Sequence, residues 1–168
     1  MMKKASLIMA TLLALPLGAL AHTAHDSGHH AAKAVVKEQK PWGIAGDAKD
    51  ARRTIDIRMT DNMRFTPDRI EVREGETVRL RVVNAGKVLH ELVIGTRQAL
   101  DEHAELMRKH PNMEHDEPHM AHVTPGRTGT LVWHFNRPGE FDFACLIPGH
   151  YQAGMIGRIT VVPKSQGK

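Results

Sequence analysis

The sequence has 168 residues, with 23 Lys and Arg against 19 Asp and Glu, which gives a net charge of +4 when the histidines are neutral. This length suits one domain with a proper core. The charges are mixed in sign along the chain, with no basic stripe and no interleaved aromatic residues, which argues against nucleic-acid binding. The unusual features are the twelve histidines and the single cysteine.

The first predicted element is an N-terminal export signal. A basic pair at residues 3–4 precedes an apolar run that ends in Ala19-Leu20-Ala21, a small-x-small pattern typical of signal peptidase cleavage. A membrane anchor is the alternative, but the run contains Pro16 and is short for a span of about 20 residues. We therefore expect residues 1–21 to be a signal peptide to the periplasm, with no membrane insertion after cleavage.

The next segment, residues 22–52, is rich in Ala, Gly, His and Lys and shows no sustained apolar period. We predict a flexible tail here. Histidine-rich tracts bind copper or zinc at modest affinity, and cleavage after Ala21 would offer one metal both the amine and the imidazole of His22. The candidate accessory ligands in this tail are His22, His25, His29 and His30.

From residue 53 onward, short segments alternate apolar and polar residues with a period of two, and Gly, Pro and Asn turns separate them. This pattern predicts an all-β sandwich or barrel over residues 53–168. The apolar positions of the predicted strands are Ile55, Ile57 and Met59, then Ile70 and Val72, then Val78, Leu80 and Val82, then Leu92 and Ile94, then Leu131, Trp133 and Phe135, then Phe141 and Phe143, and finally Ile159 and Val161.

One segment interrupts the strands. Residues 97–110 predict a helix with Leu100, Ala104 and Met107 on one side, and a polar loop dense in Met and His follows. Thioethers suit Cu(I), and imidazoles suit either oxidation state of copper. The insert therefore offers candidate accessory copper ligands: His103, Met107, His110, Met113, His115, His119, Met120 and His122. The alternative is that Met107 packs on the sandwich while the histidines face water.

His90 and Cys145 share their strand faces with apolar residues, so we expect both side chains to point into the sandwich. Exported proteins usually pair their cysteines, but Cys145 has no partner in its own chain. Buried ionisable groups need partners. A metal ion shared by the thiol and the imidazole would satisfy both.

The segment CLIPGHYQAGM, residues 145–155, adds His150 and Met155 to this pair. A thiolate, two imidazoles and a weak axial thioether form the blue-copper set. Zinc is disfavoured because it prefers further Cys or His ligands to a thioether. A cysteine protease would want its Cys at a helix N-terminus or beside a His base. We therefore predict one copper ion at His90, Cys145, His150 and Met155.

At this point the residues resemble a known family. The C-x4-H-x4-M loop and the upstream His of VLHELVIG, together with the strand pattern, resemble the cupredoxins, the plastocyanin/azurin superfamily of type 1 copper proteins. The resemblance implies a Greek-key β-sandwich with copper at one end. It implies equatorial ligands at His90, Cys145 and His150 and an axial ligand at Met155.

Two positions depart from the common cupredoxin pattern. Many cupredoxins have Asn after the first ligand His and Ser or Thr after the Cys, whereas this chain has Glu91 and Leu146. Hydrogen bonds around the sulfur tune such a site. The potential and the colour of the centre are therefore left open.

A narrower resemblance suggests the role. The His-rich N-terminus, MTDNMRFTP, KVLHELVIGT and the Met/His insert look like the periplasmic copper-resistance cupredoxins. That group implies copper tolerance through sequestering copper, passing it on or oxidising Cu(I). The implied partners are copper ions and a redox or copper-transfer protein.

Two other functional classes compete with copper resistance. An electron shuttle would use the same copper centre, with a docking patch at Pro148, Gly149, Ala153 and Gly154 around His150. A multicopper oxidase would need His-x-His pairs, which the sequence lacks. We therefore expect a redox-active copper protein for copper resistance rather than a dedicated enzyme.

Overall fold

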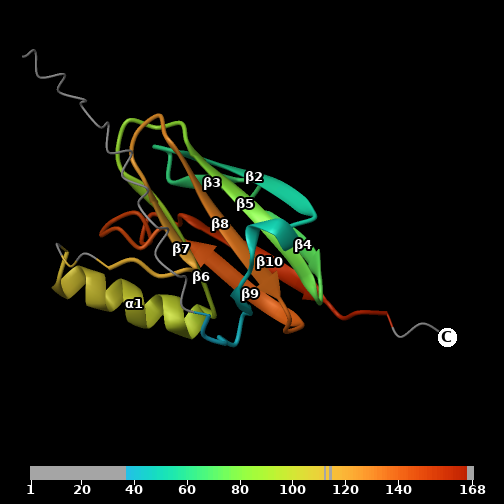
Figure 1. The fold of residues 1–168 in the computed structure, drawn as a ribbon. Helices are drawn as coiled ribbons and strands as arrows, with labels where there is room; N and C mark the ends of the chain where they lie inside the picture. Colours follow the sequence, from blue (N-terminus) through green and yellow to red (C-terminus); the bar gives the residue numbers. More distant parts are fainter. Residues whose placement is uncertain (1–36, 112, 114, 166–168) are drawn as a thin grey trace, which may run out of the picture. The chain divides into compact units, whose positions relative to one another are not determined.

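The computed structural model describes residues 37–111, 113 and 115–165, and these form a β-sandwich with one helix (Figure 1). The strands are β1 (Ile44–Ala45), β2 (Arg53–Thr60), β3 (Arg64–Thr66), β4 (Arg69–Arg73), β5 (Glu76–Asn84), β6 (His90–Gly95), β7 (Met120–Val123), β8 (Thr128–Phe135), β9 (Gly139–Ala144) and β10 (Ile156–Val162). One sheet has the order β1-β8-β5-β2-β3 and the other the order β4-β10-β9-β6-β7. The predicted sandwich is confirmed.

The alternation of apolar residues accounts for the core. In β5, Val78, Leu80 and Val82 are fully buried, while Arg81 is exposed. These residues belong to one buried cluster with Phe143 and other side chains of the second sheet. Burying an apolar side chain of this size contributes about 1.5–3 kcal/mol, so the two apolar sheet faces hold the sandwich together.

Helix α1 (Arg97–Lys109) lies where the sequence predicts it. It begins after Thr96, whose side chain accepts a hydrogen bond from the Ala99 backbone N–H at 3.2 Å. Its buried residues, Leu100, Ala104 and Met107, are spaced four and three apart and therefore share one face. The first two join a second apolar cluster with residues of β6, β7 and β9 and of the loop after β9, namely Val93, Met120, Ala144 and Leu146. Figure 1 shows the helix beside this sheet.

The predicted flexible tail is wrong for residues 37–52, the described part of the stretch 22–52. Strand β1 pairs antiparallel with β8, and the short 3-10 helix Ala48–Asp50 follows it. Trp42 is buried, and its carbonyl accepts a hydrogen bond from Trp133 Nε1 at 2.8 Å. This segment covers an edge of β8 that would otherwise be open. The predicted signal peptide 1–21 and tail residues 22–36 lie outside the described residues.

The Met/His insert also ends differently from the prediction. Its last four residues form β7, which pairs antiparallel with β6 at the edge of the second sheet. Only the ends of β7, Met120 and Val123, are buried, so the sequence gives no period-two signal for this strand.

Among the residues that the structure describes, no helix is long and apolar enough to cross a membrane.

Candidate metal centre

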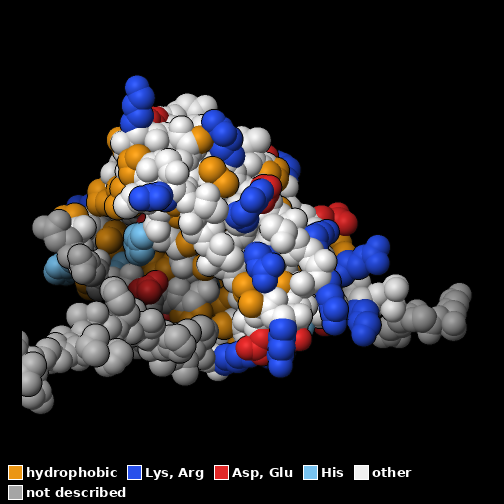
Figure 2. All heavy atoms as spheres, turned by 45° about the horizontal axis from the view of Figure 1, so that its top comes forward, with side chains coloured by type: hydrophobic (Ala, Val, Ile, Leu, Met, Phe, Trp, Pro, Cys, Tyr) orange, Lys and Arg blue, Asp and Glu red, His pale blue; other side chains and the backbone are white. Residues whose placement is uncertain are grey.

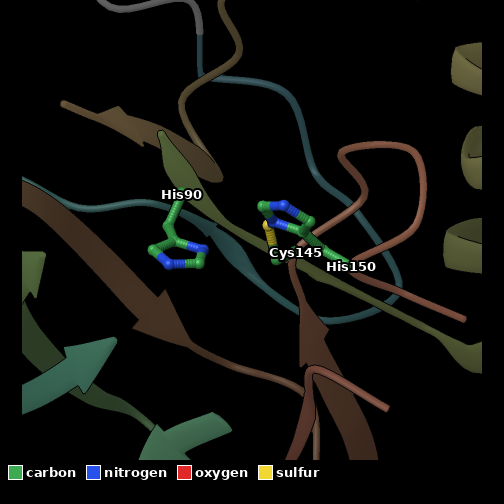
Figure 3. A group of neighbouring side chains, drawn as sticks. All are labelled: His90, Cys145 and His150. Carbon is green, nitrogen blue, oxygen red and sulfur yellow. The ribbon is translucent and has the colours of Figure 1, made fainter. Parts of the chain in front are cut away.

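Three of the four predicted copper ligands meet at one end of the sandwich. One imidazole nitrogen from each of His90 and His150 and the sulfur of Cys145 lie within 4.8 Å of one another. His90 begins β6, whereas Cys145 and His150 lie on the loop between β9 and β10. Figure 3 shows the Cys145 sulfur beside the ring of His150, with the ring of His90 facing them. The fold thus brings together His90 and Cys145, which are 55 positions apart in the sequence.

The loop 145–155 closes on itself through its own backbone. The Cys145 N–H donates to the Met155 carbonyl, and the Met155 N–H donates to the His150 carbonyl, each at 3.1 Å. Gly149 and Gly154 turn the chain with φ angles of +90° and +87°, in the region that favours glycine. These bonds fix the loop backbone at the three residues from which the predicted ligands extend.

Asp61 sets the proton position on His90. His90 is fully buried, and its Nε2 lies 3.1 Å from Asp61 Oδ1. The backbone N–H of Lys87 and the His90 imidazole hold the pKa of Asp61 below its usual value. An ionised carboxylate only accepts, so the neutral imidazole of His90 carries its proton on Nε2. His90 Nδ1 is buried without a hydrogen-bond partner, so the lone pair of this nitrogen is available for a metal.

Sequence reasoning did not single out Asp61 as a functional residue. It lies in the turn after β2, inside the segment MTDNMRFTP, where a single Asp is ordinary turn chemistry. Its carboxylate also packs against the glycine of the NAGK turn: a Cβ at Gly86 would lie 1.9 Å from Asp61 Oδ1. The contact depends on two turns meeting in space, which no local pattern encodes.

Cys145 is a buried thiol that lacks an opposite charge. Burial raises its pKa to about 12, because removing a thiolate from water is costly. The Glu91 backbone N–H approaches the sulfur at 3.4 Å, and His150 Nδ1 lies 3.3 Å from it. A bound metal cation would supply the charge that stabilises the thiolate.

The two departures from the cupredoxin pattern are bonded to each other. The backbone N–H of Leu146 donates to Glu91 Oε1 at 2.7 Å. Glu91 is 2% exposed, and its own N–H reaches the Cys145 sulfur. Glu91 therefore ties the strand that carries His90 to the loop that carries Cys145.

The remaining two ligand candidates complete a donor set that fits copper. Burial, followed by the nearby His90, lowers the pKa of His150, so its imidazole is neutral at pH 7 and able to coordinate. Met155 is fully buried in the same apolar cluster as Cys145. A thiolate, two imidazoles and a thioether suit copper better than zinc or magnesium.

The structure places the accessory candidates in different parts of the fold. His103, His115 and His122 approach one another, and Met107 and Met113 line the adjoining pocket. His119 instead packs edge-on between Trp42 and Trp133, and Met120 lies in the apolar cluster under α1. His110 is exposed at the end of α1. The tail candidates His22, His25, His29 and His30 lie outside the described residues.

Comparison with known proteins identifies the family of this chain. The sequence model of the copper-binding proteins of the plastocyanin/azurin family matches residues 51–162. A copper-resistant cuproprotein CopI from Rubrivivax gelatinosus is 44% identical, over 95% of this chain and 96% of that protein. CopI from Pseudomonas aeruginosa is 34% identical, over 79% of this chain and 88% of that protein.

A solved structure shares the fold. The dithionite-reduced auracyanin from Roseiflexus castenholzii superposes with a TM-score of 0.58 and 22% identity, over 67% of this chain and 99% of that chain. At that identity the likeness speaks for the fold alone. The family match over residues 51–162 and the similarity to CopI together show that this chain belongs to the plastocyanin/azurin family of copper-binding proteins, the cupredoxins.

Proposed function

We propose that this protein is a periplasmic type 1 copper protein that acts in copper resistance, with copper held by His90, Cys145, His150 and Met155. The observation that carries the proposal is the buried Cys145 thiol grouped with two imidazoles, one of which presents an unpartnered buried nitrogen. Copper bound there supplies a one-electron Cu(I)/Cu(II) couple.

The residues around the centre have separate tasks in this proposal. Asp61 holds the His90 ring with its Nδ1 free, and Glu91 fixes the Cys145 loop against β6. The buried walls exclude water from the sulfur, since Leu146 and Met155 are almost fully buried. A rigid frame that does not rearrange between oxidation states suits both Cu(I) and Cu(II).

Two further observations support the resistance role. The relatives that match nearly full length are named copper-resistant cuproproteins. The chain also carries twelve histidines, many more than one type 1 centre needs. Periplasmic placement is supported by the N-terminal pattern that predicts a signal peptide over residues 1–21.

An electron shuttle is the second candidate, and one surface feature favours it. Val88 and Leu89, next to His90, are 43% and 42% exposed, and an apolar surface near a copper ligand would suit docking of a redox protein. A deletion strain separates the two functions. If the protein acts in copper resistance, the deletion strain should grow poorly on copper, and the parent gene should restore growth whereas the Cys145→Ala gene should not. Normal copper tolerance with a respiratory defect would favour the shuttle.

The proposed export has its own test. The periplasmic fraction of cells that produce the protein should contain a chain that begins at His22 by N-terminal sequencing. A chain found only in the cytoplasm, with residues 1–21 retained, would contradict periplasmic placement.

A further inference from the structure

Glu91 is a buried carboxylate beside the candidate copper centre, and it lacks a basic partner of the usual kind. Glu91 and Asp142 are the two buried carboxylates of the described chain. Asp142 pairs with Arg97 at 2.9 Å and with Arg158 at 3.5 Å. Among the described residues no Lys or Arg pairs with Glu91, whose partner is the imidazole of His122. Figure 2 shows the Lys and Arg side chains spread over the surface of the face that it draws.

The hydrogen bonds of Glu91 favour its ionised form. The Leu146 N–H donates to Oε1 at 2.7 Å, and His122 Nε2 lies 2.8 Å from Oε2. A carboxylate only accepts, so His122 donates to it from Nε2. Hydrogen bonds donated to a carboxylate stabilise its charge. Because both of its oxygens accept such bonds, Glu91 places a negative charge inside the protein.

This negative charge lies close to the predicted copper ligands. The Glu91 backbone N–H approaches the Cys145 sulfur at 3.4 Å, and Glu91 Oε1 accepts from the peptide N–H that directly follows Cys145. Glu91 also follows His90 directly in β6. Its side chain is 2% exposed, whereas that of His122 is 37% exposed. Water therefore screens the charge of Glu91 much less than it screens a proton on His122.

The charge balance around Cys145 differs between the two oxidation states of copper. Cu(II) with the Cys145 thiolate carries a net positive charge, which the Glu91 carboxylate offsets. Cu(I) with the same thiolate is neutral, so the carboxylate then has no positive charge to offset at the centre. A buried charge without compensation is costly. The carboxylate of Glu91 therefore stabilises the Cu(II) form relative to the Cu(I) form.

We propose that the negative charge of Glu91 lowers the reduction potential of the copper centre and so holds the bound copper toward Cu(II). This role rests on the proposed type 1 centre. It goes beyond the hydrogen bond that ties β6 to the Cys145 loop, because that bond needs only an oxygen that accepts from the Leu146 N–H. A neutral amide would supply such an oxygen, whereas only a carboxylate supplies the charge.

The test compares the variant Glu91→Gln with the parent protein. Glutamine keeps an oxygen that accepts from the Leu146 N–H and removes the negative charge. The reduction potential of each copper-loaded protein is measured by redox titration of the thiolate-to-copper visible band. We expect the variant to retain the band. Its preference for Cu(I) over Cu(II) should rise about tenfold relative to the parent, which is a reduction potential about 59 mV higher for a one-electron couple.

The matched control is Glu105→Gln on α1, which removes an exposed carboxylate that pairs with Arg108 and should leave the reduction potential unchanged. An unchanged or lower potential in Glu91→Gln, with the band retained, would overturn the charge effect and leave the type 1 centre in place. An equal rise in Glu105→Gln would overturn it as well. A copper-loaded parent protein without the visible band would overturn the type 1 centre and the role of Glu91 together.

Infrared spectra of the unmodified protein cover the case in which Glu91→Gln fails to fold. The side-chain carboxyl of glutamate is labelled with carbon-13, and the spectra of the Cu(I) and Cu(II) forms are subtracted. Among the glutamates that the structure describes, Glu91 is the buried one. We therefore expect a label-sensitive carboxylate band that shifts with the oxidation state of copper. The absence of any label-sensitive shift, or a label-sensitive band of a protonated carboxyl in either form, would overturn the role of Glu91.

Discussion

At the scale of single residues, the reactivity of the centre depends on which side-chain atoms carry protons. His90 has its Nε2 proton directed at Asp61 and its Nδ1 free. Cys145 keeps its proton, since burial raises its pKa to about 12. Both observations give measurable consequences for copper binding.

Replacing Asp61 with Asn should weaken copper binding by about 10–100-fold. An amide donates as well as accepts, so it no longer selects the His90 tautomer that leaves Nδ1 free. The matched control is Asp56→Asn on β2, whose carboxylate is exposed and pairs with Arg81. Competition with a chelator measures both affinities. Equal affinities for Asp61→Asn and the parent would contradict the tautomer argument.

Copper binding at the thiolate centre should release one proton, because the Cys145 thiol is protonated at neutral pH and coordinates as thiolate. The sign follows directly: release on binding makes affinity rise with pH, by about tenfold per unit between pH 7 and 9. Titration of protein with Cu(II) in weakly buffered solution measures the proton count. An affinity at this centre that stays flat over this range would show that the thiol is already ionised.

At the scale of elements, the segment before β2 holds an edge of the first sheet through Trp42. Replacing Trp42 with Ala removes a buried indole and should lower the free energy of unfolding by about 3 kcal/mol. Chemical denaturation measures the loss, and the copper spectrum should persist because the centre lies on other elements. Leu106→Ala is the control, since Leu106 is 43% exposed. A loss for Trp42→Ala no greater than that of the control would contradict the packing of this segment.

His119 joins the same segment to β8 by packing between Trp42 and Trp133. Burial lowers its pKa from 6.5 to about 4, so the folded protein resists protonation more than the unfolded chain. Metal-free protein should therefore lose stability as pH falls from 6.5 to 4, by about 2 kcal/mol after allowing for partial exposure.

The variant His119→Gln should remove that part of the pH dependence, whereas exposed His110→Gln should retain it. Thermal unfolding at a series of pH values measures the effect. The same pH slope in His119→Gln and parent would show that His119 is not held neutral by its burial.

The sequence predicts the elements whose information is local. The alternating strands, helix α1 and the loop 145–155 are found where their patterns place them. Strands β1, β3 and β7 were not predicted, because each is too short to alternate and exists only through pairing with β8, β2 or β6. The roles of Asp61 and Glu91 could not be predicted from the sequence for a related reason. Their roles depend on contacts with His90 and Leu146 that form only when distant turns meet.

At the scale of the whole molecule, the sandwich brings its candidate copper ligands together from β6 and from the β9–β10 loop. A ligand that binds only the native state stabilises it. Copper should therefore raise the melting temperature of the parent by several degrees and that of Cys145→Ala much less. Calorimetry at equal copper concentrations makes the comparison. Equal shifts in both proteins would indicate that copper stabilises the fold mainly through other sites.

Visible absorption during Cu(II) titration tests most directly whether Cys145 binds copper together with His90, His150 and Met155. We expect an intense thiolate-to-copper band whose intensity at saturation corresponds to one copper per chain and which is absent in folded Cys145→Ala. A folded parent protein that takes up copper and remains without this band would contradict it.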